Sequence, residues 1–106
     1  MGQKPFEIMR WESANPPTMD FLVRMMAREG LESNQSELPA QSRSQEMKFD
    51  QVSVTVVVSG RLQYAFPGYG VIDVEPGDIL EISPGVLHDV SVSSTQPAIL
   101  LQALRG

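Results

Sequence analysis

His88 is the only histidine in the 106-residue chain, and it is the residue best suited to chemistry. Imidazole is the side chain that gains and loses a proton most readily near neutral pH, so it could serve as a general base or as a metal ligand. The chain has no cysteine, which excludes disulfides and thiolate chemistry. No nucleophile can be paired with His88 from spacing. Four carboxylates are expected to be solvated: Asp50, Asp73, Asp78 and Glu81.

The residues around His88 alternate as those of a strand do. In "HDVSVS", residues 88–93, His88 shares a face with two valines, and Asp89 shares the opposite face with two serines. The apolar face of a half-buried strand points to the core, so we expect His88 to point inward, near the mouth of what the sheet encloses. Asp89 then points away and cannot orient the ring. Two roles are open for His88: a hydrogen bond to nearby backbone, or a place in a pocket wall.

Short strand-like segments follow one another from Met47 onward. They are rich in β-branched residues or alternate in hydropathy, and turns with Gly and Pro separate them. Strands that recur about every 8–12 residues are typical of an all-β sandwich or barrel. The expected strands are residues 52–59, 61–66, 71–75, 79–82, 87–93 and 97–104.

The N-terminal part predicts one helix within residues 16–30, which Thr18 can cap. Four apolar residues share one face of this helix and should pack against a sheet: Met19, Leu22, Met25 and Met26. Phe6 and Trp11, nearer the N-terminus, could add an edge strand. The polar stretch after the helix, residues 31–46, predicts a loop or irregular edge structure.

The segment "PGDILEISPGVLHDV", residues 76–90, resembles the second conserved motif of the cupins. Gly77, Gly85 and His88 fall in register with that motif. The segment "VTVVVSGRLQYAF" upstream resembles the end of the first cupin motif, with Gly60 as its final glycine. The two motifs occur in the expected order and at the expected spacing.

This resemblance implies an all-β fold: a small antiparallel β-barrel, or double-stranded β-helix (the cupin jelly roll), with one N-terminal α-helix. It implies a single cupin domain over residues 1–106, with an N-terminal strand, helix and loop in 1–44 and the barrel core in 45–106. It also implies a homodimer.

Cupins usually hold a metal ion through two histidines and a glutamate of the first motif and the histidine of the second. Counting back from the first-motif glycine gives the three missing positions as Met47, Phe49 and Ser53. The longer family spacing puts the two histidines at Glu46 and Lys48 instead. Divalent ions need three or four such donors, so no cofactor is expected with His88 alone. The alternative is a divalent transition metal held by His88 and a substituted ligand: Glu46, Gln45 or Gln51.

Because Met47, Phe49 and Ser53 are apolar or uncharged, the barrel interior is expected to form a pocket. Its predicted lining is His88, Met47, Phe49, Tyr64, Val56, Leu80 and Ile82. The favoured function is to bind a small, partly apolar molecule in a metal-free or weakly metal-binding pocket, as a sensor or carrier. Two alternatives stay open: a metal-dependent dioxygenase, isomerase or lyase with substituted ligands, and a degenerate barrel that serves as a dimeric interaction module.

The amino-acid composition argues against two classes of binding partner, nucleic acids and membranes. The net charge is −5, from 8 basic and 13 acidic residues, and the basic residues are scattered singly. Nucleic-acid binding, which normally needs clustered Lys and Arg, is therefore not expected. No apolar run approaches the roughly 20 residues of a membrane span, so no membrane partner is expected. The lack of cysteine is compatible with the cytoplasm, which is the expected location.

Overall fold

The computed structural model of the chain describes residues 4–105. Its elements confirm an all-β fold with one N-terminal helix. In chain order they are β1 (Phe6–Met9), α1 (Met19–Arg28), β2 (Asn34–Leu38), β3 (Arg43–Met47), β4 (Val52–Ser59), β5 (Leu62–Phe66), β6 (Gly70–Val74), β7 (Ile79–Ile82), β8 (His88–Val92) and β9 (Ala98–Arg105).

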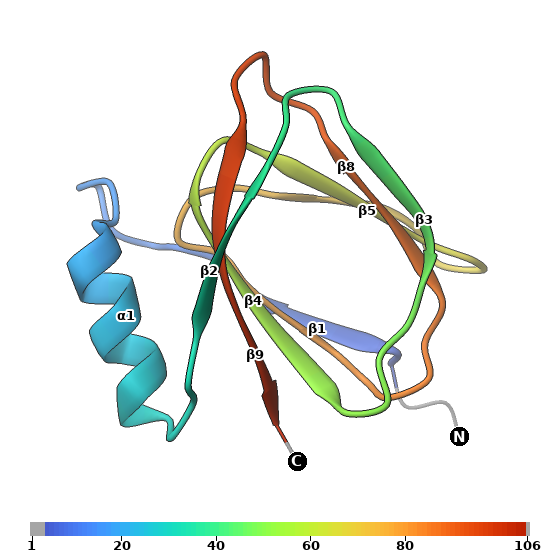
Figure 1. Cartoon of the computed structure of the whole chain (residues 1–106), viewed down its shortest axis with the longest axis horizontal. Helices are drawn as coiled ribbons and strands as arrows, with labels where there is room; N and C mark the ends of the chain where they lie inside the picture. The colour runs from blue at the N-terminus through green and yellow to red at the C-terminus, as the bar shows by residue number, and fades with distance from the viewer. Residues whose placement is uncertain (1–3, 106) are drawn as a thin grey trace.

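The strands form two antiparallel sheets that face each other (Figure 1). The five-stranded sheet has the order β1-β7-β4-β9-β2, and the four-stranded sheet has the order β3-β8-β5-β6. The jelly-roll prediction is confirmed in this two-layer form. Among the described strands, hydrogen bonds do not join the two sheets into a closed barrel.

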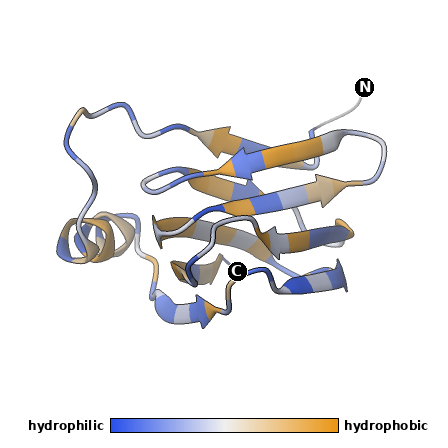
Figure 2. Cartoon of the chain, turned by 90° about the horizontal axis from the view of Figure 1, so that it is seen from above, coloured by the Kyte–Doolittle hydropathy of each residue, from blue (hydrophilic) through white to orange (hydrophobic). Residues whose placement is uncertain are grey.

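Strand β4 is buried on both of its faces, because it lies in the middle of the five-stranded sheet and α1 covers the outside of that sheet. Val57 points into the core between the sheets, whereas Val54 and Val56 pack in the cluster beneath the helix. A strand buried on both faces is expected to be apolar almost throughout, as "VSVTVVVS" is. Figure 2 shows that other strands alternate between apolar and polar residues.

Helix α1 lies outside the two sheets (Figure 1). The Thr18 hydroxyl caps it as predicted, accepting a hydrogen bond from Phe21 N at 3.2 Å. The predicted apolar face is also confirmed, because its four residues all belong to the cluster between the helix and the five-stranded sheet: Met19, Leu22, Met25 and Met26. Within residues 4–105, no helix combines the length and the apolar character that crossing a membrane would require.

The polar stretch after the helix is not a loop. It contains β2, which pairs with β9, and β3, which pairs with β8 across a register shift. Of the two forms predicted for residues 31–46, the loop is wrong and the edge position is confirmed. Both strands lie at sheet edges, as does β1, the edge strand expected from Phe6. An edge strand has one partner and an exposed side, so a polar sequence such as "NQSEL" can form one. The sheets therefore include residues well before position 45, where the barrel core was expected to begin.

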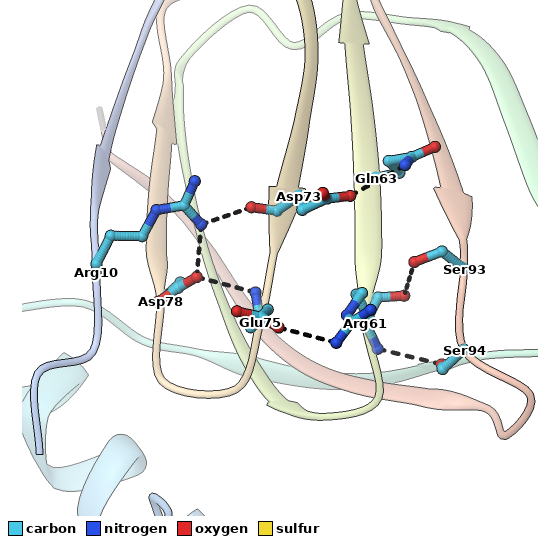
Figure 3. Close-up of polar contacts among 8 residues, drawn as sticks. All are labelled: Arg10, Arg61, Gln63, Asp73, Glu75, Asp78, Ser93 and Ser94. Atoms are coloured by element: carbon cyan, nitrogen blue, oxygen red, sulfur yellow. Dashed lines mark hydrogen bonds and ion pairs between the residues drawn. The ribbon is translucent and has the colours of Figure 1, made fainter. Parts of the chain in front are cut away.

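A polar network closes one end of the sandwich (Figure 3). Asp78 was expected to be solvated, but it is only 4% exposed, and that prediction is wrong. Its carboxylate accepts hydrogen bonds from Trp11 N at 2.8 Å, Glu75 N at 2.9 Å and Arg10 Nη1 at 2.8 Å. These bonds fasten the segment after β1 to the β6–β7 turn. Since β7 starts beside Asp78 and ends at Ile82, the network and Ile82 lie at opposite ends of the strand.

Candidate functional site

A cavity of about 100 Å³ lies between the two sheets, on the side where β2 and β3 form the sheet edges. Seven of the strands contribute to its wall, together with the loop after β3. The lining residues are Ser36, Leu38, Ser44, Met47, Phe49, Ser53, Thr55, Tyr64, Ile82, His88, Val90, Leu100 and Gln102.

The structure brings together most of the residues predicted to line a pocket. Those in the cavity wall are His88, Met47, Phe49, Tyr64 and Ile82. Leu80 is buried in the core between the sheets but does not reach the cavity. The prediction that Val56 lines the pocket is wrong. Val56 packs beneath α1, and its neighbour Thr55 faces the cavity instead. The sequence does not show which residues of β4 point between the sheets, because both faces of this strand are buried and apolar.

His88 points between the sheets, as predicted, but it is only 2% exposed and is deeper than the expected mouth position. Its Nδ1 lies 3.0 Å from the carbonyl oxygen of Val86. A carbonyl only accepts, so Nδ1 carries the hydrogen, and the neutral ring keeps its lone pair on Nε2. The rings of Phe49, Tyr64 and Phe66 lie with their centroids 6.0, 5.9 and 5.8 Å away. Backbone bonding and a wall position, offered as alternatives by the sequence, thus occur together.

A β-bulge in β3 decides which side chain faces His88. Ser44 pairs with Val90 and Met47 pairs with His88, so β3 has one more residue than β8 between these two pairs. In a regular ladder Glu46 would lie opposite His88, because each step along one strand matches one step along the other. Glu46 instead adopts φ 54°, in the left-handed region. The bulge therefore sets a thioether, and not a carboxylate, beside the imidazole.

Asp89 holds this bulge from the outer face of the four-stranded sheet. Its Oδ1 accepts a hydrogen bond from Glu46 N at 2.9 Å, and its Oδ2 lies 3.5 Å from Arg43 Nη2. The Glu46 N–H, aided by the Arg43 guanidinium, holds the pKa of Asp89 below its ordinary value. Asp89 thus points away from His88, as the alternation predicted. It affects the cavity indirectly, because it holds the bulge that sets which residue of β3 faces His88.

The cavity wall also contains hydroxyl groups that the sequence prediction did not include. Ser53 and Thr55 are fully buried, and Gln102 Nε2 donates to Ser53 Oγ at 3.4 Å. Motif counting pointed to Ser53 as a former ligand position. Thr55 could have been found by alternation from Ser53 along β4, had the inner face of that strand been known.

Thr55 and Tyr64 each add a hydroxyl group to the cavity wall. Within the described residues, Thr55 Oγ1 is buried and makes no hydrogen bond of good geometry. An unpaired buried hydroxyl costs about 1–3 kcal/mol of stability. Burial raises the pKa of Tyr64 to about 12, and the nearby Thr55 hydroxyl opposes this shift only in part. The Tyr64 phenol therefore stays protonated at neutral pH.

The wall does not fit a divalent ion of the kind that the sequence resemblance implies. Met47, Phe49 and Ser53, the positions that the shorter motif count gives for the missing ligands, all line the cavity with His88. A thioether, a phenyl ring and a hydroxyl supply neither the charge nor the donors that complete such a site. In residues 4–105, no three His, Cys, Asp or Glu side chains gather closely enough to hold a metal ion.

No family model and no curated protein matches the sequence. Solved structures match over most of the chain. A cupin 2 domain-containing protein from Halorhodospira halophila has a TM-score of 0.68 at 13% identity, and the match covers 96% of this chain and 79% of that one. A DUF861 family protein from Thermotoga maritima has a TM-score of 0.62 at 14% identity, over 94% and 99%.

A third match is acireductone dioxygenase from Bacillus anthracis, a structure with a cadmium ion in the active centre. It has a TM-score of 0.62 at 15% identity, covering 93% of this chain and 77% of that one. At identities this low, the three likenesses show a shared fold alone. That fold agrees with the one implied by the two sequence motifs.

Proposed function

We propose that this protein, which has the cupin fold, binds a small, partly apolar molecule in the cavity around His88 without a bound metal ion. One observation supports the proposal: His88 shares a cavity with Met47, Phe49 and Ser53, the residues that the motif count gives for the missing ligand positions. Small β-barrels either fill their interior with side chains or hold one small ligand. The open space of about 100 Å³ favours the second case.

The competing candidate is a metal-dependent enzyme with substituted ligands. Its support is the fold likeness to acireductone dioxygenase, whose structure carries cadmium. The opposing argument is the donor set, because a single imidazole beside a thioether and a hydroxyl is a poor site for a divalent ion. The third candidate, a dimeric interaction module, needs no ligand in the cavity at all.

We further propose that the protein is a cytoplasmic homodimer. The support for a dimer is the exposed apolar surface at the edge of the four-stranded sheet, where Val71 is 61% and Tyr69 is 59% exposed. An uncovered strand edge with apolar side chains invites pairing with another chain. The lack of cysteine is compatible with the cytoplasm.

Metal analysis and a thermal-shift screen of the purified protein test the main proposal together. We expect a substoichiometric metal content and at least one small molecule that raises Tm, since a ligand of the native state stabilises it by mass action. About half a transition-metal ion per chain or more, retained after dialysis, would favour the enzyme. A screen without any stabilising molecule would favour the interaction module.

A cavity-filling variant locates the binding. Ser44→Leu places a larger side chain on the cavity wall, and we expect it to abolish the Tm increase. Ser91→Leu makes the same change on β8, facing the opposite side of the four-stranded sheet, and should leave the increase intact. Equal responses of the two variants would show that the molecule binds elsewhere.

A further inference from the structure

We infer that the cavity selects an uncharged molecule of about five non-hydrogen atoms that donates a hydrogen bond to His88 Nε2 and contacts the Thr55 hydroxyl. This inference rests on the proposed function and specifies the chemistry of its ligand. A small alcohol has these properties.

The acceptor is defined by the environment of His88. Its Nδ1 is engaged by the carbonyl oxygen of Val86 at 3.0 Å and must carry the ring hydrogen. In the neutral form of the ring the remaining nitrogen, Nε2, therefore offers a lone pair, and His88 belongs to the cavity wall. A group that donates a hydrogen bond complements this nitrogen, whereas a group that only accepts does not.

The second contact is defined by Thr55. This residue is fully buried and lines the cavity. Its Oγ1 lies close enough to the Tyr64 phenol to affect the pKa of Tyr64, but it makes no hydrogen bond of good geometry in the described part of the chain. Buried polar groups in native proteins nearly always have a hydrogen-bond partner, so a buried hydroxyl without one is unusual. A ligand with a hydroxyl can supply that partner, because a hydroxyl both donates and accepts. The Tyr64 phenol on the same wall adds a further neutral hydroxyl.

The neutrality of the ligand follows from the wall composition. The side chains that line the cavity are apolar, hydroxyl, amide or imidazole groups, and none of those described is an Asp, Glu, Lys or Arg. A charged ligand would lose its hydration without meeting an opposite charge, which is strongly unfavourable. The size follows from the volume: about 100 Å³ is less than the roughly 150 Å³ of a cavity that binds benzene.

Four probes of similar size and different chemistry test the inference: isobutanol, isobutyrate, isobutylammonium and diethyl ether. Met47 lines the cavity, so its labelled methyl group reports binding by NMR, and the other five methionines serve as internal references. We expect isobutanol to shift the Met47 signal with a Kd at least about tenfold lower than those of the other three probes.

Variants at Thr55 test the second contact. Thr55→Val keeps the shape and removes the unpaired hydroxyl, so it should raise the urea midpoint of the free protein and weaken isobutanol binding at least about fivefold. Thr55→Ser retains the hydroxyl and should retain the preference for isobutanol. Unchanged isobutanol affinity in Thr55→Val, or a lowered urea midpoint, would remove Thr55 from the site.

The outcomes separate this inference from the proposal beneath it. If isobutyrate or isobutylammonium binds as tightly as isobutanol, the cavity is a binding site but its preference for neutral molecules is refuted. If diethyl ether equals isobutanol, the requirement for a donor is refuted. If none of the four probes moves the Met47 signal, the proposed function fails together with the inference.

Discussion

The imidazole of His88 is oriented by a backbone carbonyl and not by a carboxylate. Val86 O engages Nδ1, while Asp89, the neighbouring acid, lies on the other face of the strand and bonds to Glu46 N. General bases in enzymes are commonly oriented and made more basic by an acidic partner. The surroundings of His88 are aromatic rings and hydroxyls, which suit recognition of a ligand better than proton transfer.

Tyr64 gives a prediction at high pH. Burial raises its pKa from 10.0 to about 12, so the folded protein holds the phenol proton more tightly than the unfolded chain does. The resulting stability is complete below pH 10 and is lost as the pH rises towards 12. We expect a loss of about 2–3 kcal/mol in the free energy of unfolding over this range, measured by urea denaturation.

Tyr64→Phe should flatten this alkaline decline, because it removes the titrating group. The chain has one other tyrosine, Tyr69, which is exposed, so Tyr69→Phe is the matched control and should keep the wild-type slope. Tyrosinate absorbance should rise in two steps in the wild type. A single step near pH 10 would contradict the burial argument.

At the level of elements, the bulge in β3 controls the chemistry of the cavity. One inserted residue shifts the register between Ser44 and Met47. As a result Met47, and not Glu46, lies opposite His88. The bulge requires Glu46 to adopt a positive φ, which is costly for a non-glycine residue. The hydrogen bond from Glu46 N to Asp89 offsets part of that cost.

The bulge gives a prediction at low pH. The folded-state pKa of Asp89 is lowered, so its stabilising contribution is present above the ordinary aspartate value and is lost as the pH falls through the folded value. We expect Asp89→Asn to flatten the acid side of the stability curve, measured by urea denaturation from about pH 7 to about pH 2. The Glu46 amide should also lose hydrogen-exchange protection in Asp89→Ala.

The control for this experiment is Asp50→Asn, which removes an exposed carboxylate in the loop after β3. Its stability curve should run parallel to that of the wild type through the acid range. Parallel curves for Asp89→Asn and the wild type would mean that the Asp89 carboxylate does not hold the bulge.

For the whole molecule, the cavity lies apart from the polar network that closes one end of the sandwich. The cavity lies between the sheets on the β2–β3 side, whereas the network around Asp78 ties together the segments at the far end of β7. Gly77 belongs to that closure, because its φ of +88° and its contact with Trp11 leave no room for a side chain. Helix α1 covers one outer face, and the exposed edge at β6 is free to meet another chain.

The homodimer proposal is tested at this scale. We expect light scattering to give a mass twice that of one chain, and Val71→Lys to reduce it to that of a monomer, because a charge at a strand edge opposes pairing. Val23→Lys, on the exposed side of α1, should leave the dimer intact. A monomer mass for the wild type at every concentration tested would refute the proposal.

Much of the architecture could be read from local patterns. The six strands from β4 to β9, the helix with its Thr18 cap, and the inward direction of His88 all follow from hydrophobic period and turn residues. These features depend on neighbours in sequence, so the sequence alone determines them. The register of the two motifs also identified Met47, Phe49 and Ser53 as positions at the site.

Other features depend on contacts between segments distant in sequence. Polar β2 and β3 are strands because β9 and β8 offer them hydrogen-bonding edges. Val56 lies outside and Thr55 inside because α1 covers only one face of β4. The choice of Met47 over Glu46 opposite His88 depends on a bulge held by Asp89, a residue 43 positions away in sequence. Pairing register is a property of two strands together, so only the tertiary structure could decide it.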